Sequence, residues 1–108
     1  RSPAFRDEVV DRLKAHPDIM ERFGVRSLSL FGSVVRDEAR PTSDIDLMVD
    51  FLPGQPGGLF RYVELKHALE GLLGRPVDLI TSGNIKPRLR KRILEECMPV
   101  YGEGAEEE

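Results

Sequence analysis

Two short parts of the chain carry residues that together could bind a nucleoside triphosphate and Mg²⁺. Gly32 and Ser33 follow an apolar run, and Ser43, Asp44 and Asp46 come about ten residues later. A Gly-Ser turn can present backbone N–H groups to phosphate oxygens. Two carboxylates spaced two apart on a strand point to the same side, and carboxylate oxygens are the hard ligands that Mg²⁺ prefers. This combination predicts a metal-dependent phosphate site.

A third carboxylate, Asp78, lies in the apolar segment 76–81, which is typical of a second strand. If the two strands are neighbours, Asp78 comes beside Asp44 and Asp46 and could accept the proton of an attacking hydroxyl. In a two-metal site the ions lie roughly 3.5–4 Å apart, so the carboxylates must bridge or flank both of them. We therefore expect the three aspartates to form one metal pocket.

Each of these residues also has a simpler structural interpretation. Ser33 could cap a short helix after an ordinary strand-to-helix turn. Asp44 and Asp46 could be outward positions of a solvated edge strand, and Asp78 a surface residue at a strand start. Arg36, three residues after Ser33, could reach a phosphate or could pair with an aspartate and hold it in place, and we favour the structural role.

Hydrophobic periodicity predicts the elements that must position these residues. The strand 44–51 alternates, with Asp46 and Asp50 on the face opposite its apolar side chains, and Asp50 is expected at the rim. The remaining expectations are helices at 3–15 and 18–23, a strand at 25–31, a short helix at 33–38, a turn at 40–42, a loop at 53–58, a helix at 59–73, a strand at 76–81 and a last helix from 85 to 97. These pieces assemble most simply into one small α/β domain.

Length and composition limit the class of protein. The chain has 108 residues, 32% of them charged, with a net charge of −3. We expect one domain over residues 1–102 and a disordered acidic tail at 103–108. The charge argues against a dedicated nucleic-acid binder, and the basic run at 86–92 is expected to be a solvated helix face rather than a platform for a polyanion. A single cysteine, Cys97, and the lack of any apolar run near the roughly 18 residues of a membrane span favour the cytoplasm.

Read together, these motifs resemble the nucleotidyltransferase superfamily that includes DNA polymerase β. The pattern consists of Gly32-Ser33, Arg36, the pair Asp44 and Asp46, and a third aspartate on a later strand. The size of the chain and its ending at 98–101 resemble the minimal nucleotidyltransferases, or MNT proteins, of prokaryotes. The resemblance implies a mixed β-sheet flanked by helices. It also implies transfer of a nucleoside monophosphate from a nucleoside triphosphate to an acceptor hydroxyl, with release of pyrophosphate.

The resemblance also implies roles for individual residues. Gly32 and Ser33 would hold the triphosphate, and Arg36 and Ser43 would add to the nucleotide site. Asp44 and Asp46 would bind two Mg²⁺ ions. Asp78 would join them as a metal ligand and complete the site that activates the acceptor oxygen.

MNT proteins are typically paired with HEPN proteins, which are helical ribonuclease toxins. The resemblance therefore implies an antitoxin that transfers AMP from ATP to a tyrosine of a HEPN partner. Two alternatives stay open from the sequence. One is an antitoxin that occludes its partner with a weak or vestigial active site, and the other is a transferase for a small-molecule hydroxyl of the aminoglycoside type. A homo-oligomer is not excluded.

Overall fold

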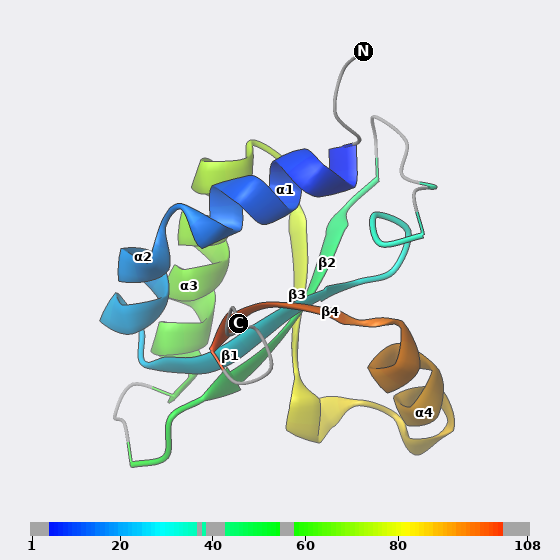
Figure 1. The fold of residues 1–108 in the computed structure, drawn as a ribbon. Helices are drawn as coiled ribbons and strands as arrows, with labels where there is room; N and C mark the ends of the chain where they lie inside the picture. Colours follow the sequence, from blue (N-terminus) through cyan, green and yellow to red (C-terminus); the bar gives the residue numbers. More distant parts are fainter. Residues whose placement is uncertain (1–4, 37, 39–42, 55–57, 103–108) are drawn as a thin grey trace.

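One four-stranded mixed sheet forms the centre of the molecule (Figure 1). The computed structural model describes residues 5–36, 38, 43–54 and 58–102. The strand order is β3-β2-β1-β4, with β1 antiparallel to both β2 and β4, and β2 parallel to β3. The strands are β1 (Val25–Phe31), β2 (Ile45–Phe51), β3 (Val77–Thr81) and β4 (Met98–Gly102). The mixed sheet that the resemblance implied is confirmed.

Three helices lie on one side of this sheet, and a fourth stands apart from them (Figure 1). The three are α1 (Phe5–Lys14), α2 (Pro17–Arg22) and α3 (Gly58–Leu73), whereas α4 (Pro87–Glu96) follows a short 3₁₀ turn, η1 (Ser82–Asn84). Their positions match the expected helices to within a few residues. Of the helices in the described part of the chain, none is long and apolar enough to cross a membrane.

The core lies between the sheet and helices α1 to α3. Ile45, Leu47 and Val49 of β2 are completely buried on this side, against Leu65 and Leu69 of α3. Side chains alternate along a strand, so burial of these three residues sends Asp46 to the opposite face of the sheet. The register of the core therefore fixes where the predicted catalytic carboxylate lies.

The short helix expected at 33–38 is wrong. The described residues of this segment form turns: the Arg36 N–H donates to the Gly32 carbonyl at 3.2 Å, and the Glu38 N–H donates to the Ser33 carbonyl at 2.8 Å. Val34 within these turns is buried in the core. Asp37 and the turn expected at 40–42 lie outside the described residues.

The strand β4 was not expected from the sequence. It begins at Met98 and contains Pro99, which has no N–H to give to a sheet and is therefore tolerated only at an edge or an irregularity. Both conditions hold, since β4 is an edge strand and its pairing with β1 shifts register between Leu28 and Ser29. The acidic tail expected at 103–108 lies outside the described residues.

Candidate functional site

The Gly32 turn and Asp46 are in direct contact. Phe31, the last residue of β1, pairs with Asp46 of β2, so the turn after β1 passes over the aspartate. Gly32 has a φ of 78°, and a Cβ built on it would lie 2.1 Å from Oδ2 of Asp46. A side chain at position 32 is therefore both strained and blocked. Glycine at this position lets the turn approach the carboxylate closely.

The parallel pairing of β2 and β3 places Asp78 directly beside Asp46, because the two residues are partners in the register. Asp44 precedes β2 by one residue, and its side chain is exposed, as is that of Asp78. Asp46 is thus flanked by the Gly32 turn on one side and by Asp78 on the other. The expectation that the two acidic strands are neighbours is confirmed.

Burial and the neighbouring charges shift the pKa of Asp46. Its partial burial raises its pKa, and the negative charges of Asp78 and Asp44 raise it further, to about 6 from an ordinary value of 3.8. The positive charge of Arg36 opposes this shift. A carboxylate that is disfavoured by burial and by like charges is stabilised when a cation arrives.

The three aspartates have the right chemistry for Mg²⁺, since they offer hard carboxylate oxygens near the starts of the neighbouring strands β2 and β3. In the described part of the chain, however, no three Asp, Glu, His or Cys side chains converge as ligands of a single ion. Because the backbones of Asp46 and Asp78 are already paired, rotation of their side chains would be enough to bring their oxygens together. The two-metal arrangement therefore stays a prediction.

The other residues of the predicted nucleotide site are placed as follows. Ser33 is half-buried in the turn beside Gly32. Ser43 lies next to Asp44, and its carbonyl accepts a hydrogen bond of 2.8 Å from Nη2 of Arg75. Their binding of nucleotide stays a prediction.

Arg36 pairs with glutamates, whereas the structural role favoured from the sequence was pairing with an aspartate. Its Nε donates to Glu38 at 2.9 Å, and its Nη1 donates to Oε1 of Glu96 at 2.8 Å. Arg36 therefore joins the turn to the end of α4.

Sequence reasoning missed Glu96, which contacts the turn most directly. Its Oε2 accepts a hydrogen bond of 2.8 Å from the Gly32 N–H, from 64 residues away along the chain. Partial burial acts to raise the pKa of Glu96, but the hydrogen bonds from Arg36 and from Gly32 outweigh it and the pKa is lowered. No signal in the sequence separates this glutamate from its charged neighbours on the helix.

Asp50, which was expected at the rim, lies near the end of β2 and is hydrogen-bonded to neighbouring elements. The Ser27 hydroxyl donates to its Oδ2 at 3.4 Å, and the Ser82 hydroxyl donates to its Oδ1. Arg26 lies 4.0 Å from the same carboxylate. Because these contacts tie β1, β2 and η1 together, we assign Asp50 a structural role.

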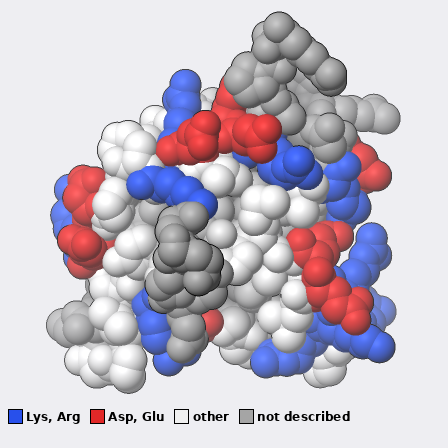
Figure 2. All heavy atoms as spheres, in the orientation of Figure 1, with Lys and Arg blue, Asp and Glu red and all other residues white. Residues whose placement is uncertain are grey.

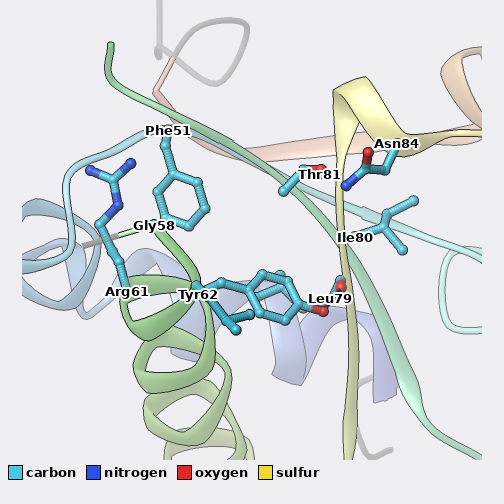
Figure 3. Close-up of a pocket in the computed structure, with 9 residues that line it drawn as sticks. Phe51, Gly58, Arg61, Tyr62, Leu79, Ile80, Thr81 and Asn84 are labelled. Carbon is cyan, nitrogen blue, oxygen red and sulfur yellow. Dashed lines mark hydrogen bonds between the residues drawn. The ribbon is translucent and has the colours of Figure 1, made fainter. Parts of the chain in front are cut away.

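A pocket of about 450 Å³ lies between the start of α3 and the ends of β2 and β3, away from the strand starts where Asp44 and Asp78 lie (Figure 3). Phe51 and Tyr62 face its interior, and the Tyr62 hydroxyl donates to the Leu79 carbonyl. Leu59 and Phe60, in the first turn of α3, are 75% and 80% exposed. Both residues lie in the helix expected at 59–73, on a part of its surface that the fold does not cover.

The basic run is a solvated helix face, as expected. Helix α4 carries no buried residue, and its Arg and Lys side chains are exposed. Figure 2 shows basic and acidic side chains next to one another in the region of α4. Among the described residues on this face the two signs are mixed near α4, which suits a polyanion less well than a uniformly positive surface.

Comparison with known proteins places this geometry in a family. The family described as a nucleotidyltransferase domain matches residues 13–101. Protein adenylyltransferase MntA of Thermococcus cleftensis is 41% identical over 95 residues, which cover 87% of this chain and 94% of that protein. A solved structure described as a provisionally assigned minimal nucleotidyltransferase is also 41% identical, with a TM-score of 0.73 over 87% of this chain and 94% of that one.

A more distant likeness concerns the fold alone. In a solved complex of a tri-AMPylated HEPN toxin from Shewanella oneidensis with an MNT antitoxin, one chain matches with a TM-score of 0.57 and 20% identity. The match covers 84% of the present chain and 70% of the other.

Proposed function

Because the chain belongs to the minimal nucleotidyltransferase family, we propose that it transfers AMP from ATP to a hydroxyl of a partner protein, with Mg²⁺ bound by Asp44, Asp46 and Asp78. The observation that carries the proposal is the position of Asp46, which touches the Gly32 turn and pairs in register with Asp78. A phosphate-binding turn and a cluster of carboxylates in contact are the two parts that this chemistry needs. These features support a donor site within this chain.

The reaction replaces one bond to the α-phosphorus of ATP by another. The acceptor oxygen bonds to the α-phosphorus, the bond to the pyrophosphate oxygen breaks, and pyrophosphate leaves. Asp78, exposed at the edge of the acidic cluster, takes the proton of the acceptor hydroxyl. Ser33 and the backbone of the turn hold the phosphates. Bound Mg²⁺ supplies charge neutralisation for the triphosphate and for the carboxylates that raise the pKa of Asp46.

We further propose that the acceptor is a tyrosine of a HEPN toxin, so that the chain acts as an antitoxin. Two findings support this proposal. One is the adenylyltransferase name of the relative from Thermococcus cleftensis, and the other is the AMPylated state of the HEPN toxin in the Shewanella oneidensis complex. The exposed apolar side chains of Leu59 and Phe60 also suit contact with another protein.

A transfer experiment with two labels tests this function. The purified chain is incubated with Mg²⁺, a candidate HEPN protein and ATP labelled either at the α-phosphate or at the γ-phosphate. We expect label on the partner only from α-labelled ATP, and loss of that label with EDTA or in the Asp46→Asn variant. Asp18→Asn, which removes an exposed carboxylate from α2, is the matched control and should label as the wild type does. Equal labelling by wild type and Asp46→Asn would refute the mechanism.

The exposed patch also favours a second candidate, an antitoxin that occludes its partner without chemistry. Leu59 and Phe60 belong to α3, away from the aspartates, so binding through them needs no carboxylate. The two functions separate in a neutralisation assay. Under occlusion, Asp46→Asn protects against the toxin as well as the wild type does, whereas under catalysis it does not.

A further inference from the structure

The turn proposed to hold the triphosphate already binds an anion supplied by the chain itself. Glu96, the last residue of α4, accepts the Gly32 N–H on Oε2 and the Arg36 guanidinium on Oε1, each at 2.8 Å. Its side chain is only 16% exposed, so the carboxylate is seated in the turn rather than extended into solvent. One carboxylate thus joins a backbone donor and a cationic donor of the nucleotide site.

A carboxylate and a phosphate compete for donors of this kind. Both are anions that accept charge-assisted hydrogen bonds from backbone N–H groups and bind guanidinium through two oxygens. A phosphate oxygen cannot take the Gly32 N–H while Oε2 of Glu96 remains 2.8 Å from it. Asp46 lies against the same glycine, so a triphosphate entering beside Glu96 would also meet two neighbouring negative charges.

Helix α4 is attached in a way that allows Glu96 to leave. None of its ten residues is buried, and Leu89 and Leu94 are 39% and 45% exposed. Glu96 makes hydrogen bonds that join the last turn of α4 to the Gly32 turn, and the chain then continues through Cys97 to Met98, which pairs with Leu30 of β1. Within the helix, Arg90 donates a 3.4 Å hydrogen bond to the Ser82 carbonyl. In Figure 1 the helix stands at the edge of the molecule, away from α1, α2 and α3. Displacement of the Glu96 side chain and fraying of the last turn therefore disturb little apolar packing of α4, while β4 stays paired with β1.

We propose that Glu96 sets the nucleotide affinity of this site, as an internal anion that occupies the Gly32 N–H and Arg36 and is displaced by a phosphate of the incoming triphosphate. The proposal rests on the proposed function, because it requires a nucleotide at the Gly32 turn. Displacement also releases the last turn of α4. A purely structural role would differ in one respect: Glu96 would then stay in place and keep Arg36 oriented toward the bound nucleotide.

Titration calorimetry with Mg²⁺ and a non-hydrolysable ATP analogue separates these roles. Glu96→Gln keeps the size of the side chain and an acceptor oxygen but removes the competing charge, so we expect the analogue to bind about fivefold more tightly or better than to wild type. Glu95→Gln makes the same charge change on a neighbouring exposed residue and should leave the Kd unchanged. Weaker or equal binding by Glu96→Gln would overturn the proposal. Failure of the wild type itself to bind would instead refute the proposed function.

A second measurement needs no variant and so does not depend on how Glu96→Gln folds. Amide hydrogen exchange of the wild-type protein is followed with and without the analogue and Mg²⁺. We expect faster exchange at the end of α4, including the Cys97 N–H that donates to the Ile93 carbonyl at 2.9 Å. Slower or unchanged exchange there in the nucleotide-bound protein would contradict displacement of Glu96.

Discussion

Replacing Gly32 by alanine tests whether the close approach of the turn to Asp46 requires glycine. The φ of 78° costs an alanine about 1–2 kcal/mol. The added Cβ would lie 2.1 Å from Oδ2 of Asp46 and 2.9 Å from its Cγ, so the carboxylate must also move, at a further cost of about 1–2 kcal/mol. We therefore expect Gly32→Ala to lower the free energy of unfolding by about 2–4 kcal/mol in metal-free buffer.

A double-mutant cycle with Asp46→Ala isolates the steric part. Alanine at position 46 removes the carboxylate and leaves its Cβ 3.1 Å from the new methyl group, a contact that a shift of a few tenths of an ångström relieves. In this background Gly32→Ala should cost only the backbone strain of about 1–2 kcal/mol, which gives a coupling energy of about 1–2 kcal/mol. Urea denaturation of the four proteins measures it. An equal cost of Gly32→Ala in both backgrounds would show that contact with Asp46 is not what requires the glycine.

Three further predictions concern other parts of the chain. Because the pKa of Asp46 is raised to about 6 in the folded protein, folding favours its protonated form, and its contribution to stability declines between pH 4 and 6. Asp46→Asn should therefore stabilise the metal-free protein at pH 7.5 by about 1 kcal/mol, a figure that discounts the full pKa shift for solvent screening, and should not stabilise it below pH 4. Thermal unfolding with EDTA at both pH values measures the difference. An equal effect of the substitution at both pH values would contradict the prediction. Asp50→Ala should destabilise the fold by about 1–3 kcal/mol because it leaves Ser27 and Ser82 without their acceptor, and a urea midpoint like that of wild type would refute its structural role. Phe60→Ser should weaken binding of a HEPN partner by about tenfold with no loss of stability, since the ring is 80% exposed, and an unchanged Kd would exclude this surface.

The sequence was sufficient where the site depends on local pattern. Alternation along 44–51 predicted the face on which Asp46 lies, because burial of one set of side chains fixes the other. The glycine after β1 was expected to let the backbone approach a phosphate, which stays a prediction, and the structure shows in addition that the turn lies against Asp46. Asp78 was expected beside Asp46 only on the condition that their strands were neighbours, and both that condition and the parallel pairing are properties of the whole sheet.

The features that were missed depend on contacts between distant segments. Glu96 reaches Gly32 from an ordinary charged helix, and no spacing rule connects the two residues. The segment with Pro99 becomes a strand because an edge position beside β1 is available to it. The expected helix after Gly32 does not form, and the described residues there make turns in which Val34 is buried in the core. For Glu96 and for β4, tertiary packing decides what local preference does not.

The mass of a HEPN partner after co-expression with this chain tests the central claim most directly. Intact-protein mass spectrometry is carried out on the partner produced with wild type, with Asp44→Asn, with Asp46→Asn and with the control Asp18→Asn. The account predicts a partner that is heavier by one or more adenylyl groups with wild type and with Asp18→Asn, and an unmodified partner with the other two variants. An unmodified partner with wild type, or an adenylylated one with Asp46→Asn, would contradict it.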